Sequence, residues 1–223
     1  MIRPIIFIVL ACYSLTLIVV EWQTSQDYVR HFFTDIEGAR PLYAINTTLS
    51  VALLWATALM FAVCLACTRD ESDRRLRWFF WSQLFVFGYL GVDDRFKFHE
   101  TLAVMLDVGD HYVLALVAAF EVACLFWLGR IIVLRRRVAF RLVVASGLFA
   151  VMLFVDACLP HDLVLRLSIE DLAKTWAAVF FLLFAWEVFS GQLRELKARA
   201  MSLPAAARTE LDNPSALCMW PQE

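Results

Sequence analysis

Apolar residues are gathered into six long segments that short polar connections separate. Each segment has about twenty residues, the length that an α-helix needs to cross a hydrocarbon core of about 30 Å at about 1.5 Å per residue. Strands of a membrane barrel would alternate polar and apolar positions over shorter segments, and this sequence does not. The pattern predicts six membrane-spanning helices, over residues 4–22, 42–67, 78–99, 112–134, 138–159 and 169–190.

Two further segments do not fit a spanning helix. Thr101–Leu106 is apolar but too short to cross a bilayer, so we expect a re-entrant or interfacial piece. After Gly191 a short charged helix end leads into a stretch with several prolines, which favours irregular structure. We therefore expect a transmembrane domain over residues 1–200 and an irregular cytoplasmic tail over residues 201–223.

The composition agrees with a membrane protein. Hydrophobic residues make up 61% of the chain and charged residues 19%, with a mean hydropathy of +0.68. Soluble domains have about 45–50% apolar and about 25% charged residues. The net charge of -2 gives no reason to expect a nucleic-acid partner.

Lysine and arginine predict the orientation, because they concentrate in cytoplasmic loops. In the six-span arrangement, 14 of the 20 basic residues fall on one side of the membrane. They lie at the start of the chain, after the second and fourth segments, and in the tail. The prediction is an all-α bundle with both ends in the cytoplasm.

The remaining polar residues gather on the opposite, outer side. All four histidines lie there, together with many carboxylates. Charges inside or at the edge of a spanning helix are costly and usually mark a functional site. Three groups stand out: Asp93, Asp94, His99 and Glu100; Asp110 and His111, with Glu121 deeper in the membrane; and Asp156, His161, Glu170, Asp171 and Lys174.

One interpretation of these charges is structural. Lys174 lies about one turn inside the last segment, where an unpaired ammonium group is expensive, so we expect it to contact Asp93 or Asp94. Glu170 and Asp156 would complete a buried ion-pair network. On a continuous helix Asp93, Lys97 and Glu100 would share one stripe, and Arg95 and His99 another.

The other interpretation is a metal centre. A catalytic zinc ion needs three protein ligands and an open position for water. His99, His111 and His161 could supply the ligands, and Asp110 and Glu100 the base. His99 and Asp110 would be roughly 16 Å apart on one continuous helix, so the chain must reverse between them. Such a pocket would suit hydrolysis of a membrane lipid.

Two resemblances bear on these interpretations. Asp93-Asp94-x4-His99-Glu100, followed by Glu170-Asp171-x2-Lys174, resembles an uncharacterised group of bacterial multipass membrane proteins, which implies a bacterial inner-membrane location. The stretch Phe98-His99-x-Thr101-Leu102, with Asp110 eleven residues after the histidine, is similar to the first half-site of the alkaline ceramidase superfamily.

In that superfamily a zinc ion held by histidines activates water, which cuts an amide or ester bond in a lipid. The resemblance implies that His99 is a zinc ligand and that Asp110 positions the water. The sequence departs from the pattern in three respects. Arg95 stands at the serine position, the late His-x3-His pair is absent, and six spans are predicted instead of seven.

Two classes of non-enzymatic protein also fit the sequence. A transporter could use Asp93, Asp94, Glu121 and Lys174 as a proton relay or ion site. An accessory or structural subunit could bind another membrane protein, or a second copy of itself, through its apolar faces. The abundant phenylalanine and tryptophan would suit either lipid or protein contacts.

Overall fold

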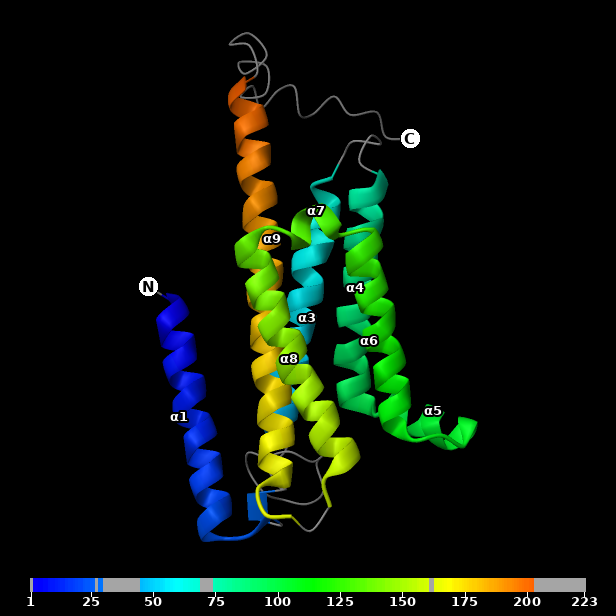
Figure 1. Cartoon of the computed structure of the whole chain (residues 1–223). Helices are drawn as coiled ribbons and strands as arrows, with labels where there is room; N and C mark the ends of the chain where they lie inside the picture. The colour runs from blue at the N-terminus through cyan, green and yellow to red at the C-terminus, as the bar shows by residue number, and fades with distance from the viewer. Residues whose placement is uncertain (1, 27, 30–44, 69–73, 161–162, 203–223) are drawn as a thin grey trace, which may run out of the picture.

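The computed structural model describes residues 2–26, 28–29, 45–68, 74–160 and 163–202, and these contain helices and no strands. The all-α prediction is confirmed for this part of the chain. The helices are α1 (Ile2–Gln23), α3 (Ile45–Ala66), α4 (Arg74–Phe96), α5 (Phe98–Leu106), α6 (Asp110–Trp127), α7 (Arg130–Val133), α8 (Arg136–Cys158) and α9 (Arg166–Ser202) (Figure 1).

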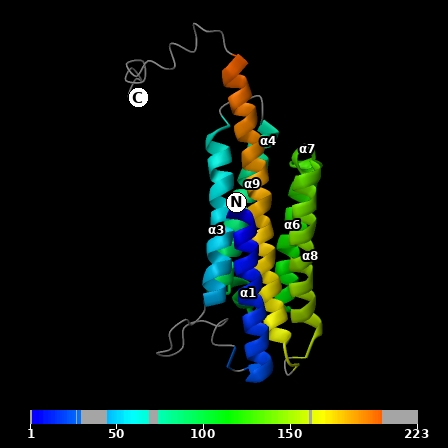
Figure 2. The ribbon, with the colours of Figure 1, turned by 90° about the vertical axis from the view of Figure 1, so that its left-hand side faces the viewer.

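The long helices run side by side along one axis, with α9 among them (Figures 1 and 2). Helix α9 packs against α3 and α8, and α3 packs against α4. Phenylalanines fill the centre: the rings of Phe61 and Phe87 are stacked 5.9 Å apart, and Phe184 is fully buried beside them. Ala145 and Ala185, also fully buried, are small enough to let α8 and α9 approach closely.

Three of the described helices are long and apolar enough to cross a membrane: α3, α8 and α9 as far as Ala198. Helices α5 and α6 form a pair bent by 112°, which counts as a fourth span if the pair is taken as one. The apolar part of α1 is shorter, and α4 carries polar side chains such as Gln83 along its length. The fold is thus a helical bundle with three or four candidate spans, and the structure does not establish the predicted six.

The helix ends differ from the predicted boundaries at three places. Helix α4 stops at Phe96 because Lys97 adopts a left-handed conformation with φ of 54°. Helix α6 stops at Trp127, before the glycine that precedes the short α7. Helix α9 runs from the span predicted to end at residue 190 straight into the charged helix end expected after Gly191, and it continues as one helix to Ser202. The predicted tail over residues 201–223 lies almost wholly outside the described residues.

Two ends of the bundle can be distinguished by charge. The starts of α4 and α8 and the last turns of α9 carry clustered arginine and lysine, and they lie at the upper end in Figure 1, the basic end. The end of α4, helix α5 and the start of α9 lie at the lower end, which we call the pocket end.

At the pocket end, the buried carboxylate of Glu21 on α1 accepts hydrogen bonds from the Leu165 backbone N–H, at 2.9 Å, and from the Ser168 hydroxyl. These bonds attach α1 to the start of α9.

Candidate functional site

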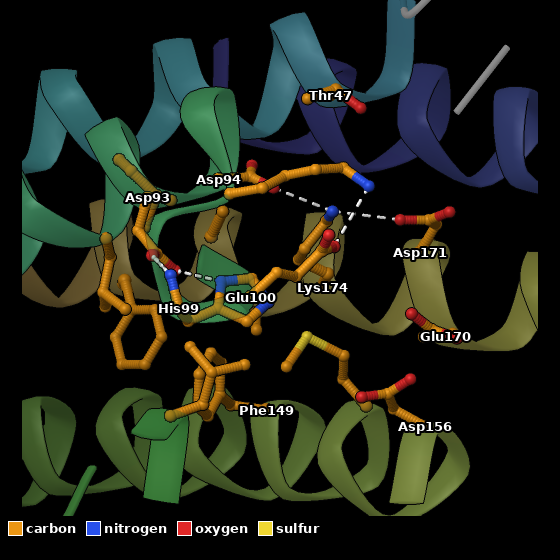
Figure 3. Close-up of a pocket in the computed structure, with 18 of the residues that line it drawn as sticks. Thr47, Asp93, Asp94, His99, Glu100, Phe149, Asp156, Glu170, Asp171 and Lys174 are labelled. Carbon is orange, nitrogen blue, oxygen red and sulfur yellow. Dashed lines mark hydrogen bonds and ion pairs between the residues drawn. The ribbon is translucent and has the colours of Figure 1, made fainter. Parts of the chain in front are cut away.

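A pocket of about 200 Å³ opens at the pocket end of the bundle (Figure 3). Its lining comes from α3, α4, α5, α6, α8 and α9, so distant parts of the sequence meet there. One part of the lining is ionisable: Asp93, Asp94, Lys97, His99, Glu100, Asp156, Glu170, Asp171 and Lys174. The other part is apolar: Leu54, Leu90, Leu114, Phe149, Met152, Leu167, Ala177, Ala178 and Phe181. The pocket is therefore amphipathic.

Asp93 and His99, which both line the pocket, are joined by two hydrogen bonds. The His99 Nδ1 atom lies 2.7 Å from Asp93 Oδ2, and the His99 backbone N–H donates to Asp93 Oδ1 at 2.7 Å. The Tyr89 hydroxyl donates to the same Oδ1 at 3.3 Å. The Asp93 side chain is 3% exposed and that of His99 is 17% exposed. The carboxylate is thus fixed by three donors, and it orients the imidazole ring.

The backbone break at Lys97 creates this contact. Residues six apart on a continuous helix point in different directions, which is why the sequence placed Asp93 and His99 on separate stripes. The left-handed Lys97 ends α4 and starts α5 in a new direction, so His99 turns back onto Asp93. The stripe prediction was wrong for this reason. Lys97 and Glu100 do lie together, with Nζ and Oε1 3.0 Å apart at an exposed position.

Lys174 occupies the centre of a second cluster. Its Nζ atom lies 2.8 Å from Asp94 on α4 and 3.0 Å from Asp171 on its own helix. The Ser50 hydroxyl of α3 also donates to Asp94. The cluster therefore connects α3, α4 and α9, and it gives the ammonium group two carboxylates in a site that is largely shielded from water. The sequence predicts Asp93 or Asp94 as the partner of Lys174, and in the structure the partner is Asp94.

A third cluster lies on the α8 side of the pocket. The Arg166 guanidinium, 7% exposed, lies 3.0 Å from Asp156 Oδ1 and 3.3 Å from Glu170 Oε2. Its Nη2 also donates to the Asp156 carbonyl at 3.1 Å. Glu170 points toward the pocket in Figure 3. Arg166 thus ties the end of α8 to the start of α9.

The structure brings together eight residues singled out from the sequence and leaves others elsewhere. The pocket gathers Asp93, Asp94, His99, Glu100, Asp156, Glu170, Asp171 and Lys174. The side chain of Asp110, and all of His31 and His161, lie outside the description. His111 is not part of the lining, and the centre of its ring lies 4.3 Å from that of Tyr112, with the two planes tilted by 43°. Glu121 is buried away from the pocket, where Gln83 Nε2 donates to it at 3.0 Å.

The described residues do not assemble the predicted zinc site. No group of three His, Cys, Asp or Glu residues among them is close enough to hold a metal ion. His161, one of the three proposed ligands, is outside the described ranges, so the zinc site stays a prediction. We derive no chemical step through a metal.

Three residues of the site were not singled out from the sequence. Arg166 is one of the basic residues outside the cytoplasmic clusters, and its i,i+4 spacing to Glu170 is a signal for a helical ion pair. Tyr89 precedes Asp93 by four residues, and the same helical spacing relates the two. Ser50 gives no such signal, because its partner Asp94 is 44 residues away in the sequence.

The arrangement has the parts of a general acid–base site. A neutral imidazole that donates its Nδ1 hydrogen to a carboxylate keeps a lone pair on Nε2, which can accept a proton. The carboxylate holds the ring in that tautomer and stabilises the imidazolium that forms. The apolar part of the lining suits an acyl chain, whereas the ionisable part suits a polar head group.

Comparison with known proteins places the chain in a family. The family model for a domain of unknown function, DUF8692, matches residues 5–188. The chain belongs to this family. The match includes α4, α5 and every described residue that lines the pocket, so the site lies within the family's domain. No curated protein and no solved structure matched the chain.

Proposed function

We propose that this member of the DUF8692 family is a membrane enzyme that hydrolyses an ester or amide bond of a membrane lipid, with His99 as the general base. The observation that carries the proposal is the contact between His99 and the buried Asp93 beside the apolar lining of the pocket. The three hydrogen bonds that the buried Asp93 carboxylate accepts would be sufficient for a role in the stability of the fold. A histidine fixed by that carboxylate and exposed to an amphipathic pocket is better suited to proton transfer.

The proposed reaction needs only water and the lipid. Nε2 of His99 removes a proton from water while the water oxygen bonds to the carbonyl carbon of the lipid. The bond from that carbon to the alcohol or amine then breaks, and the imidazolium returns its proton to the leaving group. Asp93 holds the ring throughout. Lys97 and Glu100, paired at the exposed rim, are placed to contact the head group.

We also propose the wider setting, which is a multipass protein of the bacterial inner membrane with six spans and both ends in the cytoplasm. The clustering of arginine and lysine at one end of the bundle supports this orientation, because basic residues concentrate on the cytoplasmic side. Helices α1 and α4 would be the two spans beyond the four candidates. The pocket would then lie in the outer leaflet, where lipid can reach it from the bilayer.

A second function rests on the Lys174 cluster. Lys174 pairs with Asp94 on α4 and with Asp171 on α9. Such a buried ion-pair cluster can hold helices together in a protein that has no catalytic activity. In that case the protein is an accessory or transport-like component without hydrolytic activity. The two functions differ in whether His99 matters for turnover or only for stability.

The test is a hydrolysis assay on the purified full chain in liposomes of total bacterial lipid, with products identified by mass spectrometry. Loss of a general base lowers the rate by roughly 10²–10⁴-fold, so His99→Asn should lose nearly all activity. The matched control is His111→Asn, which removes a histidine outside the pocket and should keep the wild-type rate. Folding of each variant is checked by its melting temperature.

Other results would favour the other interpretations. Equal losses in His99→Asn and His111→Asn, together with inhibition by a chelator and recovery with zinc, would replace the histidine base with the predicted metal site. A wild-type protein without any lipid product would leave the non-enzymatic network as the better account.

A further inference from the structure

The basic end of α4 carries a second feature, far from the pocket. Arg74, Arg77, Trp78 and Trp81 line a hollow there, which we call the basic hollow. Their spacing of three, four and seven residues places them on one face of the helix. All four side chains are exposed, with Trp78 at 55% and Trp81 at 39%.

Among the described residues, the two arginines of the basic hollow have no carboxylate partner. In the part of the chain that the structure describes, neither Arg74 nor Arg77 makes an ion pair, and no carboxylate lines the hollow. Arg75, which lies between them in the sequence, donates to the carbonyl oxygen of Trp127 instead. Arg74 is also the first residue of α4, and the positive end of a helix dipole favours an anion.

Trp78 and Trp81 indicate which class of anion the basic hollow would bind. Trp side chains collect at the boundary between the hydrocarbon core and the head groups of a membrane. Arg77 and Asp93 are separated by about 24 Å along α4, which is close to the thickness of a hydrocarbon core. With α4 as a membrane span, as proposed above, the basic hollow and the pocket lie near opposite faces of the bilayer. Arg74 and Arg77 are then at head-group depth, and Trp78 and Trp81 each follow one of them by one helical turn.

We infer that the basic hollow binds an anionic phospholipid. Arg74 and Arg77 contact its phosphate group, and Trp78 and Trp81 lie against the glycerol and the first part of the acyl chains. Arginine presents a planar set of donors that fits phosphate oxygens well. The two apolar rings explain why a lipid suits the hollow better than free phosphate does. This inference rests on the proposed membrane topology and does not depend on the proposed hydrolysis.

The test uses the purified full chain in a neutral detergent, titrated with phosphatidylglycerol while the melting temperature is recorded. Phosphatidylcholine with the same acyl chains and inorganic phosphate are titrated in parallel. We expect phosphatidylglycerol to stabilise the wild type and to act at lower concentration than either of the other two. Each basic residue near an anionic surface contributes about five-fold in affinity, so Arg74→Gln with Arg77→Gln should weaken phosphatidylglycerol binding by roughly ten- to thirty-fold.

The matched control is Arg136→Gln with Arg137→Gln, two exposed arginines at the same end of the bundle that do not line the basic hollow. This variant should bind phosphatidylglycerol as the wild type does. A second variant, Arg74→Lys with Arg77→Lys, keeps the charge and should retain most of the binding even if the glutamine variant folds poorly. Equal weakening in the control would overturn the inference, as would equal stabilisation by phosphatidylcholine or by inorganic phosphate.

Discussion

At the scale of single residues, the pocket is organised by charges that are costly to bury alone. Lys174 is 23% exposed and has carboxylates on two sides, and Asp93 has three hydrogen-bond donors. The need for a partner near Lys174 could be predicted from the sequence, because an ammonium group inside an apolar helix must be paired. The contact between Asp93 and His99 could not, because it depends on the left-handed backbone of Lys97, and lysine carries no signal for that conformation.

The Lys174 cluster makes a prediction about stability. Lys174→Met removes the cation and leaves Asp94 and Asp171 facing each other without it, and breaking a buried pair from one side costs about 3–5 kcal/mol. The melting temperature in detergent should fall clearly.

Adding Asp94→Asn and Asp171→Asn to Lys174→Met should recover part of the loss, because the uncompensated negative charges are removed with it. An unchanged melting temperature in the single variant would show that Lys174 reaches the head-group region and does not depend on these carboxylates.

At the scale of the elements, the apolar pattern predicted where helices lie better than where they end. The centres of the six apolar segments all fall within observed helices. The end of α4 was misplaced because Lys97 stands between two aromatic residues, Phe96 and Phe98, and none of the three residues signals a break in a helix. The charged helix end expected after Gly191 is part of α9, because charged residues such as Arg194 and Lys197 are compatible with a helix that continues outside the membrane.

Two glycines of α4 test how this helix packs against α3. A Cβ atom on Gly91 would lie 2.4 Å from Cδ1 of the Trp55 side chain, whereas a Cβ atom on Gly88 would meet nothing within 4 Å. Gly91→Ala should therefore lower the melting temperature, because overpacking typically costs about 1–3 kcal/mol.

Gly88→Ala is the matched control. It should leave stability unchanged or raise it slightly, since alanine favours a helix over glycine by about 1 kcal/mol. If both variants melt at the same temperature as the wild type, Trp55 is free to turn aside and the α3–α4 contact is looser than described.

At the scale of the whole molecule, the class of fold could be predicted and the number of spans could not. Composition and segment length are sufficient for a helical membrane bundle. The length and polarity of α1, α4 and the bent α5–α6 pair leave three or four clear spans. A helix that contributes polar groups to a buried site is less apolar than one that faces only lipid. Helix α4 contributes Asp93 and Asp94 to the pocket, and it is not among the candidate spans.

Reporter fusions test the proposed topology. Fusions after Arg75, after Arg136 and at the carboxyl terminus should report the cytoplasm, and fusions near Asp35, Asp107 and Asp162 the outside. The reason is that basic residues near the ends of spans stay on the cytoplasmic side. An outside signal from the carboxyl terminus would rule out six spans with both ends inside.

The most direct test of the central claim is an experimental structure of the His99→Asn variant in nanodiscs of total bacterial lipid, compared with the wild type. The variant should trap uncleaved lipid. The account predicts an acyl chain along Phe149 and Phe181, with the ester or amide group beside residue 99, and in the wild type a His99 ring within about 3 Å of Asp93. A pocket without lipid, or a His99 ring turned away from Asp93, would contradict the account.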